Sequence, residues 1–228
     1  MTKLFGRHKI QKMKDASHTA ADVLSSRKER DRRMRVGDFL RAAERLFAEK
    51  GYGPTTMEDI ARLAEYGTGT IYRYFASKEA LYGELLEGKL AAYLEHLLGR
   101  YEAEASPWGK LRALLHGKMD FFAQNREFMR IYVKEFVPEC SSIMVGLPPR
   151  ARELRGRCLG LMREAIEAGV RSGDFRAVDV DLAVAAISGL GNELLLHCIR
   201  VRGGESIGEA ESFMMAFIEK GLLSGGRS

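Results

Sequence analysis

The chain contains few residues suited to cross-linking or metal binding. Its 228 residues include three cysteines, Cys140, Cys158 and Cys198, and none belongs to a CxxC pair or lies at metal-ligand spacing from histidine. This scatter predicts reduced, buried thiols, with a redox-sensing cysteine as the less favoured alternative. We therefore predict neither a metal nor a cofactor.

Long apolar runs and a secretory leader are also missing. A membrane-spanning helix needs roughly 18 or more apolar residues. The longest candidate, residues 182–199, is interrupted by Asn192, Glu193 and His197. The N-terminus has basic residues but not the apolar centre of a signal peptide. We therefore expect a cytoplasmic protein with no membrane partner.

The common catalytic motifs do not occur either. The segment Gly67–Thr70 has two glycines but lacks the third glycine and the preceding strand of a phosphate-binding loop. The chain contains no nucleophile elbow, no HExxH and no paired-carboxylate motif. An enzyme is therefore the weakest of the functional hypotheses, and a substrate-turnover screen would test it.

The basic charge is concentrated at the N-terminus. Residues 1–35 contain eleven Lys or Arg against four Asp or Glu, whereas the remainder contains 25 against 27. Residues 1–18 are predicted to be a basic tail, and Thr19 to Asp22 resembles a capping box that starts an exposed helix. This extension either contacts DNA phosphates or a minor groove, or is a solvated appendage. A nonspecific, nucleoid-type DNA binder is therefore a further functional hypothesis.

Residues 55–82 are the most informative segment of the chain. Thr55 and Thr56 precede a short apolar pattern that predicts a helix over residues 57–64. A tight turn follows, and Ile71 and Phe75 then lie four residues apart on one helical face. The opposite face is polar and includes an arginine, so it suits the DNA major groove. Its residues are Thr68, Thr70, Arg73 and Tyr74.

A preceding helix completes a three-helix unit. Apolar residues recur at spacings of three and four over Val36–Lys50, and Gly51 is suited to end that helix. The segment FLRAAERLFAEKGYGPTTMEDIARLAEYGTGTIYRYFASKEALYGELL, residues 39–86, closely resembles the DNA-binding domain of the TetR family of bacterial transcriptional regulators. The resemblance implies an all-helical, homodimeric repressor that binds a palindromic operator in double-stranded DNA and is released by a small, hydrophobic effector.

The resemblance also implies individual residue roles. It assigns base-edge contacts to Thr68, Gly69, Thr70 and Arg73, and phosphate or sugar contacts to Thr55, Tyr72, Tyr74 and Lys78. It assigns Ile71 and Phe75 to the core. The turn departs from the family pattern Ala-Gly-Val-Ser, because it reads Ala64-Glu65-Tyr66-Gly67. Glu65 therefore replaces a glycine that often adopts a left-handed conformation.

The rest of the chain is predicted to be helical, which makes the fold class all-α. Three regions are expected: a basic extension (1–34), a helix-turn-helix DNA-binding domain (35–83), and a larger C-terminal helical domain for effector binding and dimerisation (84–228). Ser106 and Pro107 predict a helix start, and Asn125 is expected to cap the next helix. The predicted helices after the DNA-binding unit cover 78–104, 126–137, 150–172, 179–201 and 206–223, with a further helix beginning at Pro107, and residues 138–149 are predicted to form a loop.

Two further sites are predicted in the C-terminal domain. Small and apolar residues favour a four-helix dimer interface, or alternatively packing within one subunit, at Ala186, Gly189, Leu190, Leu194, Phe213 and Phe217. Adaptable apolar side chains that line an effector pocket, or alternatively pack in the core, are Met119, Phe122, Met129, Tyr132, Phe136 and Met162. His116, Asn192 and His197 could orient a polar ligand group or be satisfied packing residues.

Overall fold

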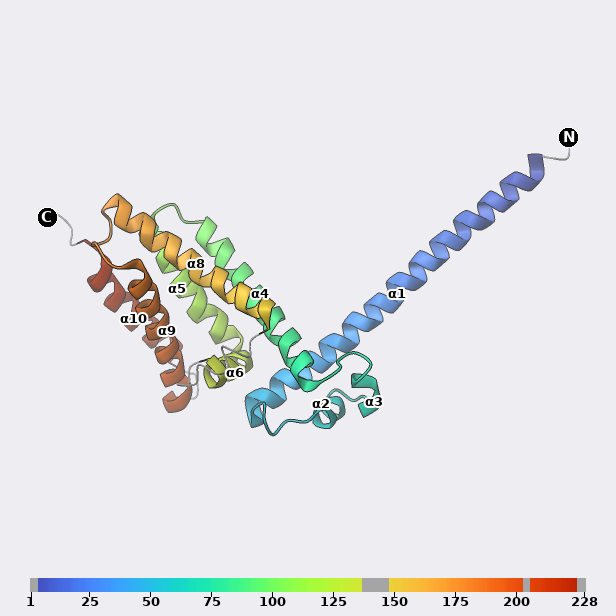
Figure 1. The fold of residues 1–228 in the computed structure, drawn as a ribbon, viewed down its shortest axis with the longest axis horizontal. Coiled ribbons are helices and arrows are strands. Elements are labelled where there is room, and N and C mark those ends of the chain that lie inside the picture. The colour runs from blue at the N-terminus through green and yellow to red at the C-terminus, as the bar shows by residue number, and fades with distance from the viewer. Residues whose placement is uncertain (1–3, 137–147, 203–205, 225–228) are drawn as a thin grey trace.

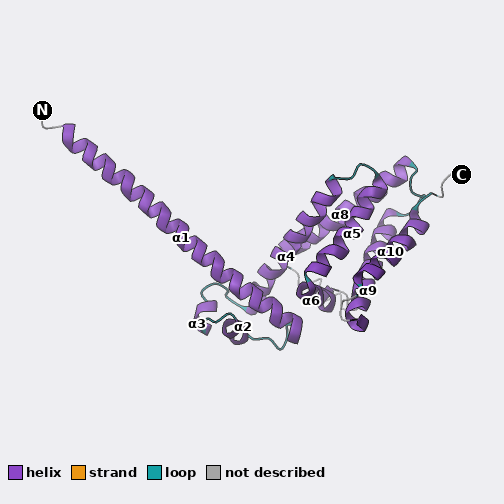
Figure 2. Cartoon of the chain, turned by 180° about the vertical axis from the view of Figure 1, so that it is seen from behind, coloured by secondary structure: helices purple, strands orange, loops and turns teal. Residues whose placement is uncertain are grey.

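The computed structural model describes residues 4–136, 148–202 and 206–224, with side chains over 27–131, 148–198 and 206–224. This part of the chain contains nine helices and no strand (Figures 1 and 2). Its one isolated β-bridge joins Phe175 to Leu223. The predicted all-α fold class is confirmed.

The N-terminal extension and the first predicted helix form one continuous helix, α1 (Leu4–Lys50), of 47 residues. The separate helix start predicted at Thr19 is therefore wrong. Proline is absent from the first 53 residues, so no residue there removes a backbone donor. Arg33 and Glu29, one turn apart, also pair at 3.2 Å. Figure 1 shows the N-terminal half of α1 projecting away from the rest of the molecule.

The second half of α1 packs against a short helix, α2 (Met57–Leu63), which in turn packs against a second short helix, α3 (Thr68–Ile71). Their shared core is built around the fully buried Phe39 and Ile60. Ile71 and Phe75 are at most 3% exposed in the same core, as predicted from their spacing, and Leu81 is buried beside them. The predicted end of α1 is also confirmed, because Gly51 adopts φ +91° immediately after Lys50.

The remaining helices form a bundle around a second, larger core (Figure 1). They are α4 (Lys78–Glu102), α5 (Pro107–Gln124), α6 (Arg126–Phe136), α8 (Pro149–Ser172), α9 (Val180–Arg202) and α10 (Ile207–Leu222). Helices α4, α5 and α8 pack against one another, α9 packs against α8, and α10 packs against α5 and α9. The predicted helix ranges agree with these bounds to within two residues.

Local signals explain several of these bounds. Ser106 Oγ accepts a hydrogen bond from the Gly109 N–H at 3.0 Å, and Pro107 opens α5. Asn125 ends α5 rather than capping α6 with its side chain, because its amide donates to Phe121 O at 2.9 Å. Gly173 ends α8 at φ +80°. The predicted loop 138–149 lies outside the described residues except for Pro148 and Pro149, and Gly203–Gly204 lies wholly outside them.

Helices α4 and α6 belong to both cores. Leu85 is buried in the first core, whereas Leu86, its neighbour in α4, is buried in the second. Ile131 of α6 is buried in the first core, whereas Phe128 and Met129 of the same helix are buried in the second. Both helices therefore connect the bundle to the three-helix unit.

Candidate nucleic-acid interface and effector cavity

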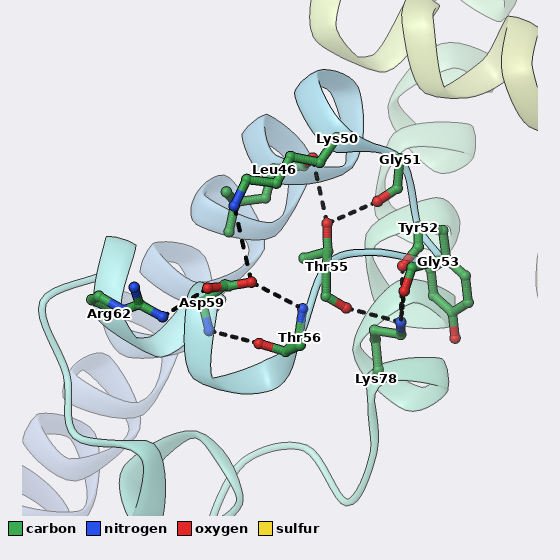
Figure 3. Close-up of polar contacts among 10 residues, drawn as sticks. All are labelled: Leu46, Lys50, Gly51, Tyr52, Gly53, Thr55, Thr56, Asp59, Arg62 and Lys78. Carbon is green, nitrogen blue, oxygen red and sulfur yellow. Dashed lines mark hydrogen bonds and ion pairs between the residues drawn. The ribbon is translucent and has the colours of Figure 1, made fainter.

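Helix α2 begins with a reciprocal capping box (Figure 3). Thr56 Oγ1 accepts from the Asp59 N–H at 3.1 Å, and Asp59 Oδ2 accepts from the Thr56 N–H at 3.4 Å. Asp59 also pairs with Arg62 at 2.7 Å and lies 4.0 Å from the ammonium of Lys50. Desolvation acts to raise the pKa of Asp59, but the Thr56 hydrogen bonds and these two cations outweigh it and lower that pKa. The start of α2 is thereby fixed to the end of α1.

The unusual turn sequence is accommodated by a left-handed residue and an aromatic anchor. Glu65 adopts φ +62°, the conformation that the family glycine often takes, at a cost of roughly 1–2 kcal/mol for a residue with a Cβ. Tyr66 offsets part of this cost, because its ring lies 5.0 Å from that of Phe39 and its hydroxyl donates to Asp38 at 2.8 Å. The turn is therefore held against α1 by Tyr66.

The segment after the turn is short and exposes its polar face. Gly67 is the N-cap of α3 and provides no side-chain cap. The helical hydrogen-bonding pattern ends with the Phe75 N–H donating to Ile71 O at 2.9 Å. Thr68, Gly69 and Arg73 are exposed, and Arg73 forms no ion pair within the described part of the chain.

The remaining predicted contact residues on this face differ in exposure. Tyr72 is 49% exposed and Thr70 is half-buried. Tyr74 is also half-buried, and its ring lies 5.8 Å from that of Phe39. Tyr74 therefore packs partly against the core, and the rest of its side chain stays on the exposed face where it was predicted.

Thr55 does not lie where the sequence comparison placed it. Its side chain is 0% exposed, and its hydroxyl donates to Gly51 O at 2.8 Å (Figure 3). A buried hydroxyl that is already donating to the end of α1 is not available to a phosphate. The predicted phosphate contact is therefore corrected to a structural role, in which Thr55 ties the 51–55 loop to α1.

Lys78 likewise lies against its own chain. Its ammonium donates to the carbonyl oxygens of Tyr52, Gly53 and Thr55 at 2.8, 3.2 and 2.9 Å (Figure 3). It also lies 4.3 Å from the centre of the Tyr52 ring, a cation–π distance. An ammonium has three N–H donors, and these three carbonyls use all of them. Lys78 therefore clamps α4 to the loop before α2, and its predicted phosphate contact stays a prediction.

An internal cavity of about 40 Å³ lies between α4, α5, α8 and α9. Of the six predicted effector residues, Met162 lines it. Met119, Phe122 and Met129 are at most 2% exposed and pack in the core instead of lining the cavity. The side chains of Tyr132 and Phe136 lie outside the described residues.

The sequence analysis missed the most polar residue of this cavity. Lys118 is only 7% exposed, and its ammonium donates to Asn192 Oδ1 at 2.7 Å. Its spacing from Leu111, Leu114 and Phe122 places it on the buried face of α5, so the sequence contained the signal. Of the other polar candidates, His116 pairs with Glu211 of α10, and the side chain of His197 is exposed.

The predicted dimer residues lie on an open apolar face of α9 and α10. Phe213 and Phe217 are 56% and 61% exposed and stack at 6.0 Å between ring centres. Ala186 and Gly189 are exposed, and Leu190 and Leu194 are half-buried. The stretch Val180–Cys198 is long and apolar enough to cross a membrane by length and composition, and 28% of it is buried. Among the described residues, no cluster of metal-ligating side chains occurs.

A short, exposed polar helix held by α1 and α2, joined to a larger helical domain, is the arrangement of a DNA-binding regulator. The family descriptions agree with this class. Residues 39–85 match the bacterial regulatory proteins of the tetR family, and residues 104–196 match the tetracyclin repressor-like C-terminal domain.

Individual relatives support the same assignment. The chain is 32% identical over 143 residues to the repressor NicS of Pseudomonas putida, covering 61% of this chain and 65% of NicS. It is 31% identical over 153 residues to the repressor KstR2 of Mycobacterium tuberculosis, covering 65% of this chain and 73% of KstR2. FadR of Bacillus subtilis, solved with stearoyl-CoA, shares the fold at a TM-score of 0.71, with 20% identity over 83% of this chain and 98% of FadR.

The chain belongs to the TetR family of bacterial transcriptional regulators. It is a DNA-binding transcriptional regulator.

Proposed function

We propose that the protein is a repressor that binds a palindromic operator as a homodimer and is released when a small effector enters the cavity between α4, α5, α8 and α9. The observation that carries the proposal is the outward polar face of α3, mounted on a unit that Tyr66, Thr55 and Lys78 hold rigid. Rigid mounting is what base readout requires, because donors and acceptors must meet base edges at fixed positions.

We assign sequence readout to the exposed start of α3 and the residues that follow. Thr68, Thr70 and Arg73 are placed to meet base edges, and Gly69 adds no side chain that would keep the backbone away from DNA. Tyr72 is assigned to the phosphate backbone, as is Tyr74 through the part of its side chain that remains exposed.

We assign dimerisation to the open face of α9 and α10. Two copies of this helix pair related by a two-fold axis would bury Leu182, Phe213 and Phe217, which are 56–69% exposed in one subunit. An apolar face of this kind is costly in water, and burying it in a four-helix interface removes that cost. The dimer presents α3 twice, which is the geometry that a palindrome requires.

We assign the coupling between effector and DNA to α4 and α6. Leu90 and Leu97 of α4 line the cavity. Lys78, at the N-terminus of the same helix, clamps α4 to the loop before α2. Lys89 of α4 also pairs with Glu44 of α1 at 2.6 Å, in a partly buried ion pair. A ligand that parts α4 from α8 therefore moves the mount of α3 and changes the spacing of the two recognition segments in the dimer.

We assign the N-terminal half of α1 to nonspecific DNA affinity. Residues 1–26 contain five Lys or Arg and two Asp or Glu, and the described residues 27–33 add five Lys or Arg and two Asp or Glu. Cations that neutralise phosphates raise affinity by counterion release without reading sequence. This assignment favours the DNA-contacting alternative for the extension over a solvated appendage. We also propose that the protein acts in the cytoplasm, where its operator lies.

The experiment that tests the proposal selects duplexes from a random pool with the full-length protein and measures equilibrium binding to the enriched sequence. We expect an inverted repeat, bound about 10³-fold or more tightly than a scrambled duplex of the same length and composition. A reporter gene behind that sequence should be repressed. Equal binding to selected and scrambled duplexes would refute the proposal in favour of a nonspecific DNA binder.

A further inference from the structure

Lys118 is a buried cation with little compensation from its own chain. Asn192 Oδ1, at 2.7 Å, is the acceptor of its ammonium, and Asn192 is neutral. Within the described part of the chain no carboxylate pairs with Lys118. Burying an ammonium without a counter-charge is strongly unfavourable, so such groups are rare in cores that do not use them. The pKa of Lys118 falls to about 7, chiefly through desolvation and then through repulsion by Arg155.

Arg155 of α8 is the second cation of the same cavity. Three other arginines of α8 are paired with carboxylates: Arg150 with Glu153 at 2.8 Å, Arg163 with Asp181 of α9, and Arg171 with Glu167 at 3.9 Å. Arg155 forms no such pair among the described side chains, and no acidic residue lines the cavity. Lys118 and Arg155, from facing helices, therefore line one cavity that has no acidic residue in its walls.

The other cavity walls are largely apolar, with Tyr93 and Ser188 as their polar members. The walls are formed largely by leucines of α4, α5 and α8, together with Met162. A ligand that fits both the cations and these walls has a negative headgroup and an apolar body. Neutral apolar compounds would leave the two cations unpaired, and cationic compounds would be repelled by them.

The size of the cavity constrains how such a ligand binds. Its volume of about 40 Å³ is far below the roughly 300–1,000 Å³ of a pocket for a small organic ligand. Binding therefore requires that α4 and α8 move apart, and α4 transmits that movement to the DNA-binding unit. A ligand that occupies the cavity therefore also displaces α3.

We propose that Lys118 and Arg155 together bind the anionic headgroup of an amphipathic effector, and that its apolar tail lies between α4 and α8 along Leu90, Leu97 and Met162. The proposal rests on the proposed function, because it names the class of compound that releases the repressor. A carboxylate and a phosphate present the same chemistry to this pair of cations, since each accepts several hydrogen bonds.

The test measures binding of four probes of equal chain length to the full-length protein by calorimetry: decanoate, decyl phosphate, 1-decanol and decylammonium. We expect at least one anion to bind about tenfold or more tightly than the alcohol, and decylammonium to bind most weakly. The stronger of the two anions identifies the headgroup as carboxylate or phosphate. Equal binding of the anions and the alcohol would overturn the proposal.

Two variants locate the site, and a third serves as the matched control. Lys118→Met and Arg155→Gln should each reduce the preference for the anion over the alcohol by about tenfold or more, while Arg157→Gln, an exposed arginine on the same helix, should leave it unchanged. An anion preference that survives both cavity substitutions would place the site elsewhere and overturn the proposal.

Measurements of operator binding distinguish a failure of the anion site from a failure of the proposed function. A wild-type protein that binds its selected operator and is released equally by decanol and by decanoate retains the function and refutes the anion site. A protein that shows no operator preference refutes the function, whatever the probes do.

Discussion

At the scale of single residues, Lys78 shows how a cation in a DNA-binding unit can serve the unit instead of the DNA. Its ammonium contacts three backbone carbonyls in residues 52–55. We expect Lys78→Ala to lower the free energy of unfolding by about 1–3 kcal/mol, because carbonyls that lose a charged donor are costly. Operator affinity should fall, while the dependence of log K on log salt concentration keeps its slope. A slope reduced by about one unit would instead show that Lys78 neutralises a phosphate.

Lys118 predicts a pH dependence of stability. Its folded pKa is lowered to about 7 from 10.5, so the unfolded chain binds more protons between those values and stability rises with pH there. The burial penalty is fully present below about pH 7 and is lost above pH 10.5. The titratable side chains that share its cavity are Arg155, Tyr93 and Cys158, and burial raises the pKa of Cys158 to about 11.

The substitution Lys118→Met removes that penalty. Its unfolding free energy should exceed that of the wild type by a few kcal/mol at pH 6, with an upper bound of about 5 kcal/mol set by the size of the pKa change. The difference should shrink towards pH 10. Denaturant titrations of both proteins at the two pH values measure it, and a difference that does not vary with pH would contradict the assignment.

At the scale of elements, the close approach of α8 to the segment after it depends on a glycine. A Cβ on Gly169 would overlap the ring of Phe175, which is 2% exposed and packs edge-on against Trp108. Gly169→Ala should therefore destabilise the bundle by about 1–3 kcal/mol through overpacking. Gly160→Ala is the matched control in the same helix: its Cβ would meet nothing within 4 Å, so helix propensity should stabilise the fold by up to about 1 kcal/mol. Thermal or denaturant unfolding of the pair checks both signs, and equal effects would contradict the packing argument.

The extension of α1 is a second element with its own expected outcome. Deleting residues 1–26 should weaken binding to selected and scrambled duplexes by the same factor and reduce the salt dependence of both. The ratio of the two affinities should stay constant, because these residues are assigned no base contacts. Binding isotherms at several salt concentrations check this, and a changed ratio would show that the extension reads sequence.

Several element bounds were predictable because their signals are local. The Ser106 cap, Pro107 and the left-handed Gly51 and Gly173 act through their own turn of backbone, so neighbouring residues suffice to predict them. The continuity of α1 was missed because a capping-box pattern at Thr19 resembles a helix start even inside a helix. A pattern of this kind marks a start only where the preceding residues cannot be helical.

The differences between the expected and the observed site have another origin. Thr55 and Lys78 were expected on the DNA surface, but each donates to carbonyls in the loop that follows α1, and Lys78 reaches residues 23–26 positions away. Contacts over such separations depend on how the helices pack, which spacing does not specify. The spacing of apolar residues was enough to predict that Lys118 lies on a buried face. It could not predict the Asn192 partner, which lies 74 residues away.

At the scale of the whole molecule, recognition of a palindromic operator requires two subunits. Phe217→Asp places a charge in the centre of the open apolar face of α9 and α10, where Phe217 is 61% exposed in one subunit. We expect the variant to sediment as a monomer and to bind the full palindrome no more tightly than a half-site. Glu219→Gln is the control: it changes the charge of α10 at an exposed position and places no charge in the proposed interface. If the Phe217→Asp protein remains dimeric, the dimer interface lies on another face of the subunit.

The central claim is that the outward face of α3 reads base sequence. Its most direct test compares wild-type protein and Arg73→Ala on a panel of operators that differ by single symmetric base-pair changes. If the claim holds, Arg73→Ala loses about 1–3 kcal/mol on the preferred operator and becomes indifferent to the base pair at one symmetric position, while other preferences persist. If Arg73→Ala weakens every duplex equally, or weakens none, α3 does not read bases through this residue and the claim is contradicted.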